Sequence, residues 1–393
     1  DSNALYNNGV SDSDGKTAIT ISATVNGSEK TWNVPLTITE AKKAATWEQG
    51  FVVGSENSSA ENYLPDGSYT FAIVATDVAN KTTQISRTVR VDTVAPNLDS
   101  TSVATSSTTK GSGESAETWY KTNSLRFTGT ASDTNTGIAS VRYRTSADGS
   151  SWTDGDVFAG TTSWSGTIEN LVSKTTRVKI IVTDNAGNVT ESEALGPYNI
   201  DMTEPVFDST SVKVNGESVS EESPLYSNGK ADVPVTFTAS DADSGVQAVY
   251  VRLYGKVTDS ATDKITASES NGTYSATIPK DSIKKSGTVY AQIVDWAGNK
   301  TDVNLFALTY DATDPKIQSY ALSDNTSGYT AYNSGKDGSG NAVYYVNNST
   351  GHTFTLSGIA TDNLGLASAV LSIGSVTKEI TDEDSLSSYS FTE

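Results

Sequence analysis

Hydrophobic and polar residues alternate in short runs along the chain. Clear examples are residues 125–131, 138–144, 164–168 and 178–182. Successive side chains of a strand point to opposite faces, so these runs predict half-buried strands separated by Gly-, Asn- and Asp-rich turns. No long helical pattern interrupts them, and the only helix candidate is the short stretch 40–45. The expected fold class is therefore all-β, built as sandwiches.

One pair of features recurs along the sequence. The stretch Asp184-Asn185-Ala186-Gly187-Asn188 is followed by a linker with Asp201 and Pro205. Related stretches start at Asp77 and Asp295, and their linkers contain Asp92 with Pro96 and Asp311 with Pro315. A repeat of about 110 residues predicts tandem domains. The expected domains are 1–95, 96–204, 205–314 and 315–393.

The second and third domains contain the same series of strands, labelled A, B, C, E, F and G in chain order. The first domain shows little before Ile19–Ala23 that could form strands A and B, although residues 12–15 resemble a B–C turn. The fourth reaches strand E at 389–392. We therefore expect the first domain to be incomplete at its N-terminus and the fourth at its C-terminus; the alternative is that the first domain is merely divergent.

Composition narrows the possible functions. The chain has 27 Lys and Arg against 47 Asp and Glu, a net charge of −20, which disfavours nucleic acid and anionic membranes as partners. It has no cysteine and a single histidine, His352, so thiolate sites and histidine acid–base pairs are not expected. No stretch approaches 18 apolar residues, so no direct membrane insertion is expected. We expect no catalytic residues, no organic cofactor and no enzymatic activity.

The Asp-x-Ala-Gly-Asn stretch, together with the Asp-x-x-x-Pro linker at this spacing, resembles the bacterial Ig-like repeats of large secreted adhesins and biofilm-associated surface proteins. The resemblance implies tandem immunoglobulin-like β-sandwiches in an extended array, located extracellularly on a bacterial cell surface. It also implies calcium at the domain junctions. The first domain departs from the pattern, because residues 77–80 read Asp-Val-Ala-Asn without the glycine.

Sandwich geometry independently predicts that acidic residues converge at each junction. The B–C and F–G loops lie at the end of the domain where the preceding linker arrives, and carboxylates are ligands that Ca²⁺ prefers. The candidate metal ligands are Asp92, Asp133 and Asp184 at the first junction, Asp201, Asp241, Asp243 and Asp295 at the second, and Asp311 with Asp314 and Asp362 at the third. The alternative is that these residues only stabilise turns, because Asp and Asn side chains bind their own backbone there.

The expected function is a non-catalytic extracellular stalk, structural or adhesive, with neighbouring domains of the array as its first partners. Host or cell-surface glycans or proteins are further candidate partners. One alternative is a subunit of a surface layer or filament, with contacts between copies of the chain and strand addition at an open edge. Another is an accessory region of a large secreted polysaccharide-active enzyme.

Overall fold

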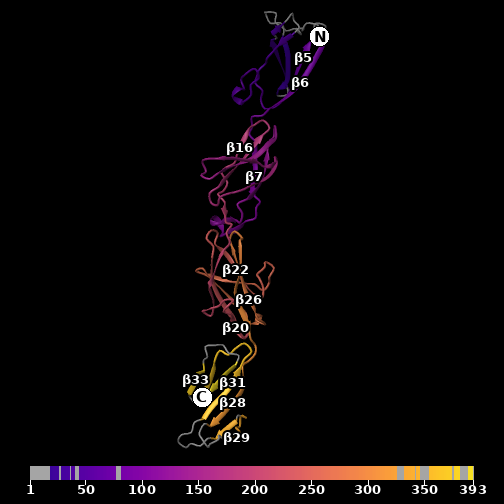
Figure 1. Cartoon of the computed structure of the whole chain (residues 1–393). Helices are drawn as coiled ribbons and strands as arrows, with labels where there is room; N and C mark the ends of the chain where they lie inside the picture. The colour runs from indigo at the N-terminus through magenta and orange to yellow at the C-terminus, as the bar shows by residue number, and fades with distance from the viewer. Residues whose placement is uncertain are drawn as a thin grey trace. The chain divides into compact units, whose positions relative to one another are not determined.

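The computed structural model describes residues 18–25, 28–35, 37–39, 44–76, 81–324, 332–340, 342–345, 354–373, 376–380 and 388–392. Their regular structure is β-strand (Figure 1), apart from three single-turn 3₁₀ helices at Ser55–Asn57, Gly113–Ser115 and Lys280–Ser282. The all-β prediction is confirmed. The chain divides into two compact units, residues 1–204 with 295–299 and residues 205–294 with 300–393, and each is described by itself.

The first segment of unit 1 is a four-stranded sheet in the order β2-β1-β5-β6. Its strands are β1 (Ala18–Val25), β2 (Ser28–Pro35), β5 (Gly67–Thr76) and β6 (Thr82–Val91). β1 lies between β2 and β5, which is the position of a C strand beside an F strand. The buried Tyr69 on β5 donates a hydrogen bond from its hydroxyl to the carbonyl oxygen of Pro65 (2.6 Å), which is the contact of a tyrosine corner.

The helix expected near residues 40–45 does not form in the described part of that stretch. Ala44–Thr46 is strand β4, which pairs with β3 (Thr37–Thr39). A run of six residues is too short to stabilise a helix by itself, whereas strand pairing satisfies its backbone at once. Residues 40–43 lie outside the described residues.

The second segment is a sandwich of the predicted type. One sheet has the order β13-β14-β10-β7, and the facing sheet has the order β12-β11-β15-β16. The strands are β7 (Asn97–Val103), β10 (Leu125–Ser132), β11 (Ile138–Ser146), β12 (Thr153–Val157), β13 (Ala159–Gly160), β14 (Ser163–Ile168), β15 (Arg177–Asp184) and β16 (Val189–Glu191). β7, β10, β11, β14, β15 and β16 correspond to the predicted strands A, B, C, E, F and G, and β12 and β13 are additional short strands.

A third, smaller sheet closes this sandwich. It contains β8 (Thr108–Lys110), β9 (Glu117–Tyr120) and β17 (Asn199–Ile200), with β17 parallel to β9. The core between the layers is built from fully buried residues, among them Phe127, Val141 and Ile180. Trp164 is also buried and stacks on Phe158, so it is a core residue and not a ligand platform.

The third segment, in unit 2, repeats the scheme in two five-stranded sheets, β19-β18-β21-β25-β24 and β20-β27-β26-β22-β23. The strands are β18 (Val206–Val214), β19 (Glu217–Ser218), β20 (Leu225–Ser227), β21 (Val233–Ser240), β22 (Val246–Leu253), β23 (Ile265–Thr266), β24 (Ser268–Ser270), β25 (Thr273–Ile278), β26 (Gly287–Asp295) and β27 (Lys300–Tyr310). Figure 1 labels β20, β22 and β26 of this segment. β20 runs parallel to the end of β27.

The fourth segment has the sheet β28-β31-β34, which corresponds to strands A, B and E. Its strands are β28 (Lys316–Asp324), β31 (Phe354–Thr361) and β34 (Ser388–Thr392). Two hairpins accompany it, β29 (Tyr332–Lys336) with β30 (Ala342–Tyr345) and β32 (Ala369–Ile373) with β33 (Val376–Ile380). β32 corresponds to strand C.

Every described sheet falls inside one of the four segments expected from the repeat. The boundaries themselves, 1–95, 96–204, 205–314 and 315–393, stay a prediction. Two of the sequence features, the turn at 12–15 and the motif at 77–80, lie outside the described residues.

Candidate junction site

The F–G turn of the second sandwich is organised by the carboxylate of Asp184. Its Oδ1 accepts hydrogen bonds from the backbone N–H groups of Ala186 (2.8 Å), Gly187 (2.7 Å) and Asn188 (2.9 Å). Gly187 has φ +97°, a conformation that glycine adopts without strain. The geometry of this turn therefore accounts for the Asp and the Gly of the motif. The side chain of Asp184 is buried, with 1% of the residue exposed.

Asp133 organises the B–C turn in the same way. Its Oδ1 accepts from the N–H groups of Asn135 (3.1 Å), Thr136 (2.8 Å) and Gly137 (2.7 Å). Three backbone donors, which would otherwise have no partner in a turn, are thereby satisfied by one side chain. The turn-stabilising alternative considered from the sequence is thus realised at Asp133 and at Asp184.

The third acidic residue, Asp92, comes from the preceding linker. Its Oδ1 accepts from the N–H of Val94 (3.1 Å) and from Nδ2 of Asn135 (3.2 Å), and its Oδ2 accepts from the hydroxyl of Thr136 (2.7 Å). Burial of Asp92 acts to raise the pKa of its carboxyl, but the hydrogen bonds from Thr136, Val94 and Asn135 outweigh that effect and lower the pKa. The linker is therefore bound to the B–C turn through an ionised side chain.

Two asparagines complete the junction. Asn188 donates from Nδ2 to the carbonyl oxygens of Asp92 (3.0 Å) and Val94 (3.2 Å), which lie in the linker. Asn185 donates from Nδ2 to the carbonyl oxygens of Thr136 (2.8 Å) and Gly137 (3.0 Å) in the B–C turn. The F–G turn thus bridges the other two elements.

The structure brings together the three acidic residues that the sequence placed at this junction. One carboxylate oxygen from each of Asp92, Asp133 and Asp184 lies within 4.8 Å of the other two. Each carboxylate also accepts hydrogen bonds from its own turn, so the negative charge is already partly compensated. Oxygen atoms in such a group are of the chemical type that binds a hard divalent cation.

Asp201 and Asp295 repeat part of this arrangement in unit 1. Both are buried, and Asn299 donates from Nδ2 to the carbonyl oxygen of Asp201 (3.0 Å) and to Oδ2 of Asp295 (2.8 Å). Burial raises the pKa of Asp295, and the nearby charge of Asp201 adds to that effect against the hydrogen bonds from Asn299 and Gly298. A second carboxylate pair is therefore held in a desolvated setting.

In unit 2, Asp241 caps its own turn through the N–H groups of Asp243 (3.2 Å), Ser244 (2.9 Å) and Gly245 (2.8 Å). Asp243 itself is exposed.

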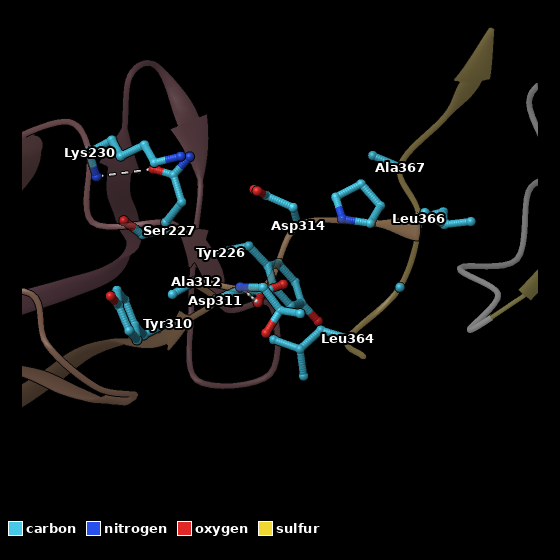
Figure 2. Close-up of a pocket in the computed structure, with 14 residues that line it drawn as sticks. Tyr226, Ser227, Lys230, Tyr310, Asp311, Ala312, Asp314, Leu364, Leu366 and Ala367 are labelled. Atoms are coloured by element: carbon cyan, nitrogen blue, oxygen red, sulfur yellow. Dashed lines mark hydrogen bonds between the residues drawn. The ribbon is translucent and has the colours of Figure 1, made fainter. Parts of the chain in front are cut away.

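At the third junction Asp311 accepts from the N–H of Thr313 (2.9 Å) and Asp362 from the N–H of Leu364 (2.9 Å). No group of three close carboxylates is found there among the described residues. A cleft of about 650 Å³ lies there instead (Figure 2). Its lining includes linker residues 311–315 and loop residues 364–367.

The sequence reading missed the asparagines and hydroxyls of the junctions. Thr190 donates to the carbonyl oxygen of Pro96, and Thr301 donates to that of Pro205 (2.6 Å). The recurrence of Asn at the end of the motif could have indicated the junction role of the asparagines. The threonines two residues later were a weaker indication of the hydroxyl contacts, because threonine is common throughout the chain.

The sequence profile of the bacterial Ig-like domain matches residues 95–195 and 205–312, which is more than half of the chain. The chain belongs to the bacterial Ig-like domain family. The two matched ranges are the second and third sandwiches, and they contain the Asp-x-Ala-Gly-Asn turns described above. The prediction of tandem bacterial Ig-like domains is thereby confirmed.

Solved structures are also similar to this array of bacterial Ig-like domains. The fibronectin(III)-like modules of Clostridium thermocellum CbhA are 14% identical, with 54% of this chain and 94% of theirs covered and a TM-score of 0.33. Titin domains Z1Z2 in complex with telethonin are 14% identical, with 56% and 98% covered and a TM-score of 0.19. At these scores no conclusion rests on either structure. No curated protein matches the chain. Within the described residues, no helix has the length and apolar character needed to cross a bilayer.

Proposed function

We propose that this array of bacterial Ig-like domains is a segment of an extracellular, cell-surface stalk whose junctions are stiffened by calcium. The observation that supports the proposal is the convergence of Asp92, Asp133 and Asp184 from a linker and two loops. A domain array transmits its geometry through its junctions, so a cation bound to three separate elements would limit bending there. By equivalence in the sequence repeat alone, we propose Asp201, Asp241, Asp243 and Asp295 as ligands for the next junction and Asp311 and Asp362 for the third.

The stalk function is supported by the tandem repeat and by a net charge of −20, which keeps such a chain soluble and away from anionic surfaces. The carboxylates at the junction are ligands of the type that calcium prefers, so we expect the stiffness of the stalk to depend on calcium. An adhesive role would need a ligand-binding tip, so we place this segment in the spacer part of an adhesin or biofilm-associated protein.

Thermal unfolding in millimolar calcium and in chelator tests the calcium part. A site that is filled at one hundred times its dissociation constant stabilises the bound form by about 2.7 kcal/mol, so the melting temperature is expected to rise by several degrees in calcium. Identical melting curves in the two conditions would reject calcium binding and leave the stalk proposal to be judged on cell-surface localisation.

Asp133→Asn is the informative variant. The asparagine side-chain oxygen can still accept the three turn hydrogen bonds, whereas one charged ligand is removed. We expect the turn to be retained and the calcium-dependent shift to shrink. The matched control is Asp156→Asn, an exposed carboxylate of β12, for which the calcium-dependent shift is expected to equal that of the wild type.

A further inference from the structure

The outer face of the β12-β11-β15-β16 sheet in the second sandwich carries a group of basic side chains. Val141 pairs with Val182 and both are buried in the core, so the next residue along each strand points outward. The outward pairs of the two central strands are Arg142 with Ile181, Arg144 with Lys179, and Ser146 with Arg177. Four positive charges therefore lie on one face of a chain whose net charge is −20.

Two of these charges are compensated and two are not. Arg144 and Lys179 both form ion pairs with Glu191 (2.6 and 3.3 Å), and Arg144 has a second acidic partner on β12. The side chains of Arg142 and Arg177 form no hydrogen bond or ion pair with any residue that the structure describes. Their guanidinium groups, at the two ends of the basic group, can therefore bind carboxylates of a ligand.

The strand register sets the spacing of these two arginines. Arg142 is four residues from Ser146 on β11, and Ser146 lies opposite Arg177. At about 3.3 Å per residue, the two arginines are about 13 Å apart along the strands, a distance that an extended peptide covers in four residues. In the row between them, the ammonium group of Lys179 lies 5.0 Å from the ring centre of the half-buried Trp152, which offers apolar surface to the middle of such a peptide.

In the third sandwich the corresponding face is covered by the chain itself. Residues 254–264 connect β22 to β23, and the carbonyl oxygen of the buried Val257 accepts a hydrogen bond from Nε2 of Gln292 on β26 (3.5 Å). The corresponding connection of the second sandwich, residues 147–152, is shorter. Its one carboxylate, Asp148, accepts hydrogen bonds from N–H groups of its own turn. The outer face of the second sandwich therefore lacks a cover of this kind.

The cover of the third sandwich shows which chemistry the face accepts. Two aspartates of the connection, four residues apart, form ion pairs with basic residues of the sheet. Asp259 pairs with Lys300 (2.8 Å), and Asp263 pairs with Arg252 (2.7 Å). Arg252 holds the position in the repeat that Arg144 holds in the second sandwich. An acidic segment with carboxylates at this spacing is thus the kind of ligand that fits the face.

We propose that the outer face of β11 and β15 is a docking site for an extended acidic segment of a different protein. Two carboxylates of this segment, four residues apart, pair with Arg142 and Arg177, and the residues between them cross Lys179 and Trp152. The basic face lies on an acidic chain, so it selects a local acidic segment by charge complementarity. Two copies of the chain, each with a charge of −20, repel one another, and for this reason we assign the segment to another protein.

A labelled synthetic peptide with the sequence of residues 257–263, Val-Thr-Asp-Ser-Ala-Thr-Asp, is a direct probe, because its two aspartates have the required spacing. Its binding to the full 393-residue chain is measured by fluorescence anisotropy in chelator, so that calcium plays no part. We expect saturable binding at one peptide per chain, and the affinity should fall as the salt concentration rises. The control peptide Val-Asp-Ser-Asp-Thr-Ala-Thr has the same composition and charge, but its aspartates are two residues apart, so it should bind about fivefold more weakly.

Changes on the receiving face complete the test. Arg142→Gln and Arg177→Gln should each weaken binding of the probe about fivefold, since each removes one ion pair. The matched control is Arg126→Gln, which removes one positive charge from the opposite sheet of the same sandwich and should leave binding unchanged. Circular dichroism melts establish that all three variants remain folded.

Four results would each overturn the proposal. The first is the absence of saturable binding by the probe peptide, and the second is equal binding by the two peptides. The third is an equal loss of affinity in the Arg126→Gln chain, which would indicate only general attraction of charge. The fourth is a dimer in sedimentation velocity that Arg142→Gln abolishes, which would assign the face to a second copy. An oligogalacturonate that binds the face when the probe peptide does not would assign it to an acidic glycan instead.

Discussion

Replacing Asn188 with alanine should loosen the first junction while leaving the second sandwich folded. The side-chain nitrogen lies within hydrogen-bond distance of three acceptors, the carbonyl oxygens of Asp92 and Val94 and Oδ2 of Asp184. An amide nitrogen carries two hydrogens, so at most two of these bonds form fully at one time. At about 1 kcal/mol for each net hydrogen bond, the substitution removes about 2 kcal/mol of linker attachment. That energy corresponds to a rise of about thirtyfold in the population with a detached linker.

Hydrogen–deuterium exchange of a peptide fragment that covers residues 92–96 measures this population. The N–H of Val94 donates to Oδ1 of Asp92, a carboxylate that Asn135 and Thr136 orient while the linker is attached, so we expect its exchange to be accelerated by up to about thirtyfold in Asn188→Ala. Amides of β11 and β15, in the core sheet, should exchange as in the wild type. Val189→Ala is the control, since Val189 is half exposed. Unchanged exchange at 92–96 would refute the assignment of Asn188 as the residue that holds the linker.

Two further outcomes are expected. Gly129→Ala should destabilise the second sandwich by about 1–3 kcal/mol, because an added Cβ would overlap the carbonyl oxygen of Ser100 and the indole of Trp164. Urea unfolding followed by tryptophan fluorescence measures this loss. The control Ser102→Ala, on the outer face of β7, should change the free energy of unfolding little. The second outcome concerns stability in acid. The pKa of Asp148 is lowered below its usual range by hydrogen bonds from the backbone N–H groups of Ser151 and Ser150 and from the hydroxyl of Ser146. The ionised carboxylate therefore stabilises the fold above about pH 4, and this contribution is lost as the pH falls further. Asp148→Ala should therefore flatten the decline of the melting temperature below pH 4, and a decline identical to that of the wild type would contradict this assignment.

The strands of the two complete sandwiches were predictable because burial imposes period-two alternation. Val178, Ile180 and Val182 are all fully buried and Lys179 is partly exposed, whereas Ile181 departs from the alternation because it is buried as well. Strand pairing also fixed which loops share an end of the domain, and for that reason Asp92, Asp133 and Asp184 could be expected to meet. The small edge strands were not foreseen. β9 and β17 are short, lack alternation, and are defined by a parallel pairing between residues about 80 positions apart.

The role of the aspartates was only half predictable. A single sequence shows only that acidic residues occupy loop positions, and this is equally true of metal ligands and of residues that cap turns. The three-donor arrangement around Oδ1 of Asp133 and Asp184 depends on backbone geometry that composition does not reveal. The helix predicted near residue 44 was wrong for a similar reason. The helix preference of Ala and Lys in this stretch is overridden by the pairing of β4 with β3.

The strand order of the third sandwich determines how it would respond to a pulling force. The chain enters through β18, which is paired with β21, and leaves through β27, which lies between β26 and β20. Tension between the two linkers therefore acts along the axes of β18 and β27, perpendicular to their interstrand hydrogen bonds. Bonds loaded in this way share the shear and must break together, whereas a hairpin pulled from its open end unzips one bond at a time. The parallel contact of Leu225–Ser227 with Leu308–Tyr310 adds a clamp where β27 leaves the domain.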